Sequence, residues 1–135
     1  MNFKTLETQG TGTRVDLEHL LAEAKWNADG LMPAIAQCAD SGEVLMMAWM
    51  NEQALRETLQ TGQVCYWSRS RQTYWRKGES SGHRQRLQQA YLDCDGDALL
   101  LSVQQQGPAC HTNRRSCFYV ALDENGGEII TAPEA

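Results

Sequence analysis

Residues 84–104 read RQRLQQAYLDCDGDALLLSVQ, and this stretch predicts two consecutive strands joined by a turn. Apolar and polar residues alternate over 84–95, which is the period of a strand with one buried face. Gly96 predicts the turn, because glycine adopts turn conformations at no steric cost. The apolar run over 98–104 predicts the second strand.

The rest of the chain also predicts more strand than helix. Apolar residues at helical spacing indicate a helix over 15–26, and Asn51 and Gly62 bound a shorter one over 52–60. The class is therefore α+β and strand-dominated, and such a fold needs its sheet edges protected, which favours a dimer. The other strands are expected over 31–39 and 44–50, as a hairpin, and over 63–70, 73–78 and 117–123.

Composition limits the class of protein. The 135 residues, 41% hydrophobic and 21% charged, are typical of a compact single domain over 1–135, with 1–12 and 125–135 as poorly ordered tails. No run is long and apolar enough to cross a membrane, and the first residues lack the apolar core of a signal peptide. We therefore expect a cytoplasmic protein without a membrane partner.

Charge is distributed unevenly along the chain. The net charge of −5 argues against a nucleic-acid partner, which usually needs a basic surface. Six of the 12 Lys and Arg residues nevertheless lie between 69 and 86, where Glu79 is the only acidic residue. A basic patch on an acidic protein favours a small phosphorylated ligand. We predict phosphate contacts among Arg69, Arg71, Arg76 and Lys77.

The basic run has two further features, a shared strand face for two of its arginines and aromatic residues between its cations. Arg69 and Arg71 are expected to share one strand face, because they are two positions apart. Trp67, Tyr74 and Trp75 interleave with the cations, and we expect ordinary packing to explain two of these three rings.

Residues 93–97 place three carboxylates and one thiol in five positions. An exposed acidic turn is the commonest form of such a run. In an extended strand, Asp93, Asp95 and Asp97 would lie on one side and Cys94 on the other. Carboxylates suit Mg²⁺ and a thiolate suits Zn²⁺, so the segment is a candidate for either metal.

Five cysteines in a chain without an export signal argue against a disulfide framework. Cys38 and Cys65 lie in apolar strands and are expected in the core. Cys110 and Cys117 are separated by six residues. This spacing fits two ordinary buried thiols at the ends of a loop as well as it fits two metal ligands. Together with Cys94 they make three thiols in polar segments, which is the number of protein ligands at a catalytic zinc with one open position.

His111 follows the first loop cysteine directly. It is either a surface histidine or a proton donor and acceptor beside a metal site.

Three segments, taken together, resemble the phosphoribosyl-AMP cyclohydrolase family of histidine biosynthesis. They are YWSRSRQTYWRKGESSGH (66–83), DCDGDALLL (93–101) and GPACHTNRRSCFY (107–119). The similarity extends from about Gly30 to Leu122, and three such segments in this order are specific. We expect the monofunctional form, without the pyrophosphohydrolase domain that some members carry.

The resemblance implies an intertwined homodimer with one zinc ion per active site. It places Cys94, Cys110 and Cys117, drawn from both subunits, on the zinc, and gives His111 an acid/base role. It also implies Mg²⁺ at Asp93, Asp95 and Asp97. Further substrate contacts are expected at Trp67, Ser68, Arg69, Arg71, Trp75, Arg76, Lys77, Gly78, Ser81 and His83.

The reaction implied is hydrolytic opening of the adenine ring of N1-(5-phosphoribosyl)-AMP between N1 and C6. A zinc-dependent purine nucleotide deaminase is the competing enzyme hypothesis, and it would release ammonia. A zinc-stapled nucleic-acid-binding module and a protein with a purely structural zinc are two further hypotheses. Neither the source of each zinc ligand nor the choice between His111 and His83 for proton transfer follows from the residues.

Overall fold

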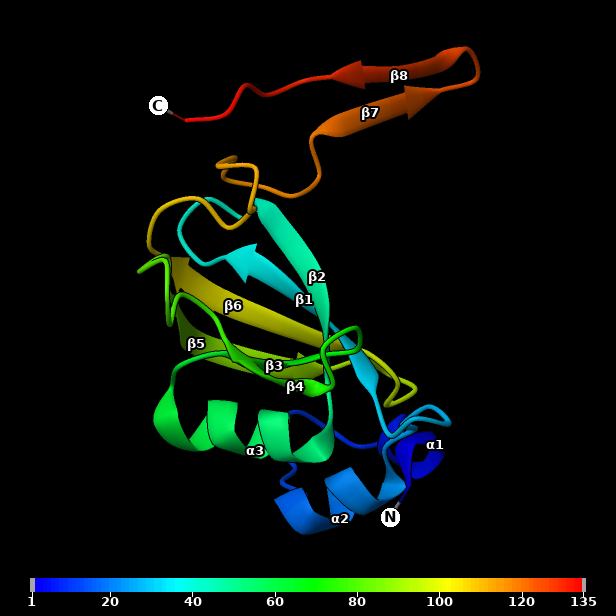
Figure 1. Ribbon diagram of the computed structural model, residues 1–135. Helices are drawn as coiled ribbons and strands as arrows, with labels where there is room; N and C mark the ends of the chain where they lie inside the picture. The colour runs from blue at the N-terminus through cyan, green and yellow to red at the C-terminus, as the bar shows by residue number, and fades with distance from the viewer. Residues whose placement is uncertain (1, 135) are drawn as a thin grey trace.

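The computed structural model describes residues 2–134, and a curled six-stranded sheet forms its centre (Figure 1). The strand order is β4-β3-β2-β1-β6-β5, with β1 parallel to β6 and every other neighbour antiparallel. The strands are β1 (Met32–Cys38), β2 (Val44–Met50), β3 (Cys65–Ser68), β4 (Thr73–Arg76), β5 (Gln85–Leu92) and β6 (Leu99–Gln105).

The sheet curls because the chain entering β3 also pairs with β5, the strand at the far edge. Val64 donates its N–H to the Gln85 carbonyl at 3.1 Å, and Leu87 donates to the Gly62 carbonyl at 2.8 Å. These bonds leave less of the sheet edge unpaired.

The core lies inside this curl and beneath one helix. Burial alternates along β1, where Met32, Ala34 and Ala36 point inward. Helix α3 (Glu52–Thr61) covers the core, and Asn51 caps it by accepting the Ala54 N–H at 2.8 Å. Two shorter helices, α1 (Phe3–Leu6) and α2 (Leu17–Glu23), precede the sheet.

The structure confirms the strand-dominated α+β class and most element positions. The helix over 15–26 is shorter than predicted, and the strand over 84–95 ends at Leu92. Cys38 and Cys65 are buried, as expected for core thiols, and none of the five cysteines is paired in a disulfide. No helix in residues 2–134 has the length and hydrophobicity that crossing a membrane requires.

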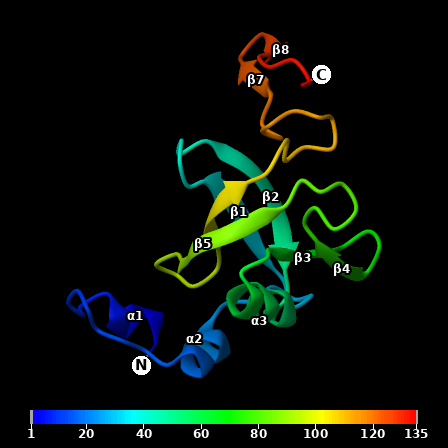
Figure 2. The same cartoon turned by 90° about the vertical axis from the view of Figure 1, so that its left-hand side faces the viewer.

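A C-terminal hairpin was not predicted in full. It joins β7 (Val120–Asp123) to β8 (Gly126–Ile129) and stands apart from the sheet in both views (Figures 1 and 2). The segments 1–12 and 125–135 were expected to be tails, whereas the structure gives α1 and β8 regular secondary structure within them.

Candidate active site

A polar cleft of about 560 Å³ lies between the loop that follows β4 and the loop that follows β6. The two loops meet where the His83 ring lies against Gly107, so closely that a Cβ on Gly107 would be 2.7 Å from the ring. The cleft brings together ten of the predicted site residues: Arg71, Trp75, Arg76, Lys77, Gly78, Ser81, His83, Cys110, His111 and Cys117.

The shape of the first loop depends on Gly78. Its φ of +83° favours glycine, and a Cβ there would lie 2.5 Å from the backbone nitrogen of Arg84. The Gly78 carbonyl accepts the Gly82 N–H at 2.8 Å, which closes a tight turn. Gly78 therefore allows the loop to fold back and form one wall of the cleft.

Cys110 and Cys117 form a hydrogen-bonded thiol pair on the second loop. Burial opposes ionisation of Cys110, but hydrogen bonds from Thr112 and Cys117, with the charge of Arg114, outweigh it and lower its pKa. The Thr112 hydroxyl lies 3.0 Å from the Cys110 sulfur. Burial and the adjacent Cys110 raise the pKa of Cys117 to about 11. Of the two thiols, Cys110 therefore loses its proton more readily than Cys117.

Lys77 closes the cleft from the other side. Its Nζ donates to the Ala109 carbonyl at 2.6 Å and lies 5.2 Å from the Trp75 ring centroid. Burial lowers the pKa of Lys77, while the thiols of Cys117 and Cys110 oppose that effect. A half-buried cation therefore lies beside the thiol pair and favours a negative ligand there.

The two candidate histidines both line this cleft. His111 is exposed on the second loop, and His83 is half-buried on the first. Each side chain is therefore placed to exchange a proton with a ligand in the cleft.

The basic residues fall into two groups. Arg76 is engaged by Glu57 of α3 through two bonds of 2.8 Å. Arg69 and Arg71 have no carboxylate partner within residues 2–134, and the Arg69 guanidinium lies 4.5 Å from the Trp49 ring centroid. The prediction that both share a strand face is wrong, because β3 ends before them and they lie in the β3–β4 turn.

The aromatic residues of the run mostly support the core, as expected for two of the three. Tyr74 and Trp75 pack against the core, whereas Trp67 contacts Tyr74 edge-on at 5.0 Å. Trp67, Ser68 and Arg69 line a neighbouring cavity that shares Arg71 and Trp75 with the main cleft.

The acidic run 93–97 is a turn, which is the commonest form of such a run, and the alternation expected of an extended strand does not occur. Gly96 has a φ of +70°, and its N–H bonds back to the Asp93 carbonyl at 3.1 Å. Burial opposes ionisation of Asp93, but N–H groups of Asp97, Ala98 and Gly96 bond to it and lower its pKa. The hydrogen bond between Asp97 and Asp93, together with the negative charge of Asp93, raises the pKa of Asp97.

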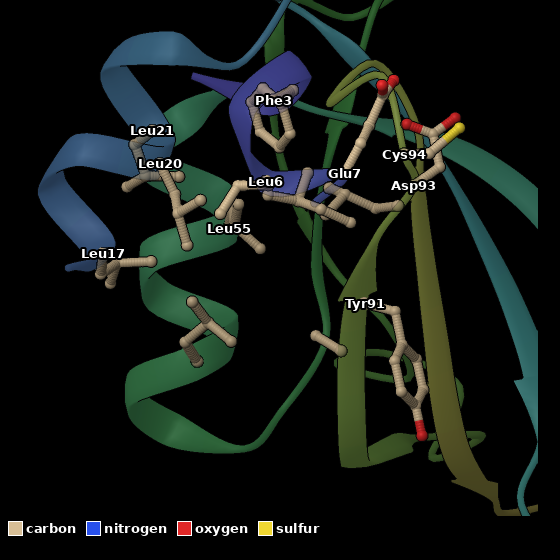
Figure 3. Close-up of a pocket in the computed structure, with 14 residues that line it drawn as sticks. Phe3, Leu6, Glu7, Leu17, Leu20, Leu21, Leu55, Tyr91, Asp93 and Cys94 are labelled. Atoms are coloured by element: carbon tan, nitrogen blue, oxygen red, sulfur yellow. The ribbon is translucent and has the colours of Figure 1, made fainter. Parts of the chain in front are cut away.

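Cys94 lies far from the thiol pair of its own chain. It precedes β6, whereas Cys110 follows β6, a strand of seven residues. At about 3.4 Å per residue the strand alone separates their positions by roughly 20 Å. Cys94 instead borders an apolar groove with Asp93 and the helix α1 (Figure 3).

The donor set therefore fits a zinc site only in part. Two neighbouring free thiols, Cys110 and Cys117, provide half of a tetrahedral sulfur site. Within residues 2–134, no three His, Cys, Asp or Glu side chains converge in a way that would hold one metal ion. The predicted third thiol and the three aspartates thus do not join the pair within a single chain.

Several cleft residues were not predicted from the sequence. Thr112, which contacts Cys110 without lining the cleft, was also missed, although its position two residues from Cys110 could have indicated it, because a hydroxyl group can donate to a nearby sulfur. The others had no distinguishing pattern: Met46, Tyr74, Glu79, Ser80, Pro108, Ala109 and Asn113.

Comparison with known proteins identifies the same family that the three sequence segments resemble. The family model described as phosphoribosyl-AMP cyclohydrolase matches residues 46–119. A phosphoribosyl-AMP cyclohydrolase of Alkalilimnicola ehrlichii is 67% identical over 132 residues, covering 98% of this chain and 93% of the relative. One of Chromohalobacter salexigens is 66% identical, covering 97% and 90%. A phosphoribosyl-AMP cyclohydrolase 2 of Pseudomonas fluorescens is 63% identical, covering 98% and 90%.

Proposed function

Because this chain belongs to the phosphoribosyl-AMP cyclohydrolase family, we propose that it hydrolyses N1-(5-phosphoribosyl)-AMP in histidine biosynthesis. The observation that carries the proposal is the thiol pair Cys110–Cys117, set in a cleft beside the Lys77 cation. A nucleotide with two phosphoryl groups suits such a cleft, because buried cations bind phosphate oxygens strongly.

The proposed reaction adds water across one bond of the adenine ring. The oxygen of water bonds to C6, the C6–N1 bond breaks, and N1 takes up a proton. The exocyclic amine stays attached, so no ammonia is released. His111 and His83 are the side chains of the cleft that are suited to move the protons at neutral pH.

The thiol pair suits a zinc ion, and Cys94 is the proposed third ligand. When bound, zinc is a Lewis acid that lowers the pKa of a coordinated water to about 7. Thr112 holds the Cys110 sulfur through its hydroxyl, which is the supporting role that neighbours of metal ligands commonly have.

We infer that the complete site needs two chains. Cys94 lies at the opposite end of β6 from the pair, so one chain provides Cys110 and Cys117 and a second chain provides Cys94. This arrangement makes the homodimer a condition of activity. It also gives each dimer two equivalent sites, since a two-fold contact is the same in both directions.

The aspartates of the turn 93–97 would then reach the cleft of the partner together with Cys94. Their clustered oxygens suit Mg²⁺, which is commonly held by one or two carboxylates together with substrate phosphates. Arg69 and Arg71, without carboxylate partners in the described residues, are the cations best placed to add phosphate contacts. The cytoplasmic location stays a prediction.

Turnover of phosphoribosyl-AMP by purified protein tests the proposal. Ultraviolet absorbance would follow ring opening, ammonia would be assayed in parallel, and zinc content would be measured on the same sample. We expect ring opening without ammonia in the wild-type protein and its loss in Cys94→Ala, whose exposed thiol is not needed for the fold of one chain.

Three results would contradict the proposal. Release of one ammonia per turnover would identify a deaminase. A folded, zinc-loaded protein that shows no turnover in the presence of Mg²⁺ would exclude the cyclohydrolase activity. Unfolding on chelation, without any activity in the loaded protein, would indicate a structural zinc.

A further inference from the structure

The C-terminal part of the chain carries a row of exposed apolar side chains. Val120, Leu122 and Ile129 lie on the β7–β8 hairpin, and Leu122 is 82% exposed. Phe118 and Ile130 flank the two strands and are also exposed. We call residues 118–130 the apolar arm. An isolated two-stranded hairpin is marginally stable in water, and a continuous exposed apolar surface commonly marks a contact site.

The base of the apolar arm is tied to the loop that carries the thiol pair. Arg114 donates to the Thr131 carbonyl at 2.6 Å, and its guanidinium lies 3.9 Å from the Tyr119 ring centroid. The Asn113 side chain donates to the Glu134 carbonyl at 2.6 Å. These contacts fix the direction in which the arm leaves the loop, although every residue of β7 and β8 is exposed.

An apolar groove of about 430 Å³ lies beside Cys94 (Figure 3). Residues of α1, α2 and α3 form one side, and Tyr91 and Leu92 at the end of β5 form the other. Leu17 and Tyr91 are exposed at its border. The groove therefore offers an apolar surface to a ligand or a protein segment.

We propose that the apolar arm of each chain packs in the apolar groove of a second copy of the chain. This inference rests on the proposed function, which brings Cys94 of one chain to Cys117 of the other. Two sulfurs on one zinc ion are about 4 Å apart. Since Phe118 directly follows Cys117, the arm of one chain begins next to the groove residues Asp93 and Cys94 of its partner.

The arm does not fill the groove of its own chain. Figures 1 and 2 place the β7–β8 hairpin at the opposite end of the molecule from α1 and α2. In a reciprocal exchange each copy inserts its apolar arm into the apolar groove of the other. A single two-fold axis then buries both arms and both grooves. The arm and the shared zinc site then form one continuous interface.

The first test places a charge on the arm. In Leu122→Asp the replaced side chain is exposed and touches no core residue, so the single chain should still fold. We expect the dimer dissociation constant, measured by sedimentation, to rise about tenfold or more, as for loss of an apolar interface anchor. Met47→Asp, at an exposed apolar residue of β2 outside the arm and groove, is the control and should keep the wild-type constant.

The second test identifies the surface that the arm contacts. A photo-crosslinking phenylalanine derivative replaces Leu122, and chains labelled with ¹⁴N and ¹⁵N are mixed before irradiation. We expect mixed-isotope cross-links to peptides that contain residues 3–7, 17–21, 55–59 or 90–94. Cross-links within one chain, or to another face of the partner, would overturn the inference. An unchanged dissociation constant in Leu122→Asp would also overturn it.

The two proposals fail in different ways. If the wild-type protein does not open phosphoribosyl-AMP, the proposed function fails whatever the cross-links show. If it turns over substrate but the arm is found elsewhere, only the exchange of arms fails.

Discussion

Cys94 and Cys110 lie beyond opposite ends of the same strand, β6, because one precedes Leu99 and the other follows Gln105. A seven-residue strand keeps their positions roughly 20 Å apart, whereas two ligands of one zinc ion have sulfurs about 4 Å apart. Within one chain the two thiols are therefore too far apart to bind the same zinc ion. A zinc site containing both cysteines requires a second chain.

The turn at Gly78 should be more sensitive to substitution than the neighbouring turn at Gly82. Both have a left-handed φ, +83° and +80°, but a Cβ at Gly78 would lie 2.5 Å from the Arg84 backbone, while one at Gly82 meets nothing within 4 Å. Gly82→Ala should cost about 1 kcal/mol of stability from strain alone. Gly78→Ala should cost more and lower kcat/KM, because it displaces a wall of the cleft. Equal urea midpoints for the two variants would contradict this account.

Thr112 should strengthen zinc binding without binding zinc itself. Its hydroxyl lies 3.0 Å from the Cys110 sulfur. Thr112→Val keeps the shape but removes the hydroxyl, and we expect zinc affinity to fall about tenfold, as for other neighbours of metal ligands. Thr112→Ser should restore it. Competition with a chromophoric chelator measures both affinities, and wild-type affinity in Thr112→Val would remove the proposed role.

Arg71 and Arg76 should affect the enzyme differently, although both line the cleft. Arg71 has no carboxylate partner in the described residues, so Arg71→Gln should raise KM about tenfold through loss of a charged phosphate contact. Arg76 is held by Glu57, and Arg76→Gln should mainly lower stability, by about 1 kcal/mol or less. Steady-state kinetics and urea unfolding separate the two effects. A larger KM increase in Arg76→Gln would reverse the assignment.

Cys65 should make the protein less stable as the pH rises above 9. Burial, followed by the Glu57 contact, raises the pKa of its thiol from 9.0 to about 12. Between these values the unfolded chain loses a proton that the folded chain keeps, so the free energy of unfolding falls by up to about 1.4 kcal/mol per pH unit.

The raised pKa of Cys117 also lowers stability at high pH. The contribution of Cys65 is therefore measured as the difference between the wild type and a Cys65 variant. Urea unfolding at fixed protein concentration and several pH values from 8 to 10.5 gives the slope. Cys65→Ala should have a shallower slope than the wild type. Cys94→Ala, which lacks an exposed thiol instead of a buried one, is the control. Identical slopes in Cys65→Ala and the wild type would contradict the assignment.

The sequence was most informative where a regular period extends over several residues. Strands such as β2 and β6 alternate or are continuously apolar, and they lie close to their predicted positions. Strand β8 was missed because GGEI has no strand-like composition, and its conformation depends on pairing with β7. The strand over 84–95 was predicted to continue to Asp95, but it ends at Leu92, and residues 93–97 form the turn that was predicted at Gly96.

The site was predicted through its residue types, whereas the arrangement of those residues was not. The Cys110–Cys117 pair and the loop at Gly78 could be predicted because the residues of each lie close together in the sequence. The distance of Cys94 from that pair depends on the direction of β5 and β6, which no local pattern specifies. The contact of Arg76 with Glu57 likewise depends on how α3 packs beside β4.

Mixing two inactive variants tests the shared site most directly. Cys94→Ala and Cys110→Ala each remove one proposed zinc ligand from every site of their own homodimers. In a mixed dimer one site regains both cysteines, so equimolar subunit exchange should restore about a quarter of the wild-type turnover of phosphoribosyl-AMP. No recovery after exchange has been demonstrated by mass would contradict the account and place all ligands of a site on one chain.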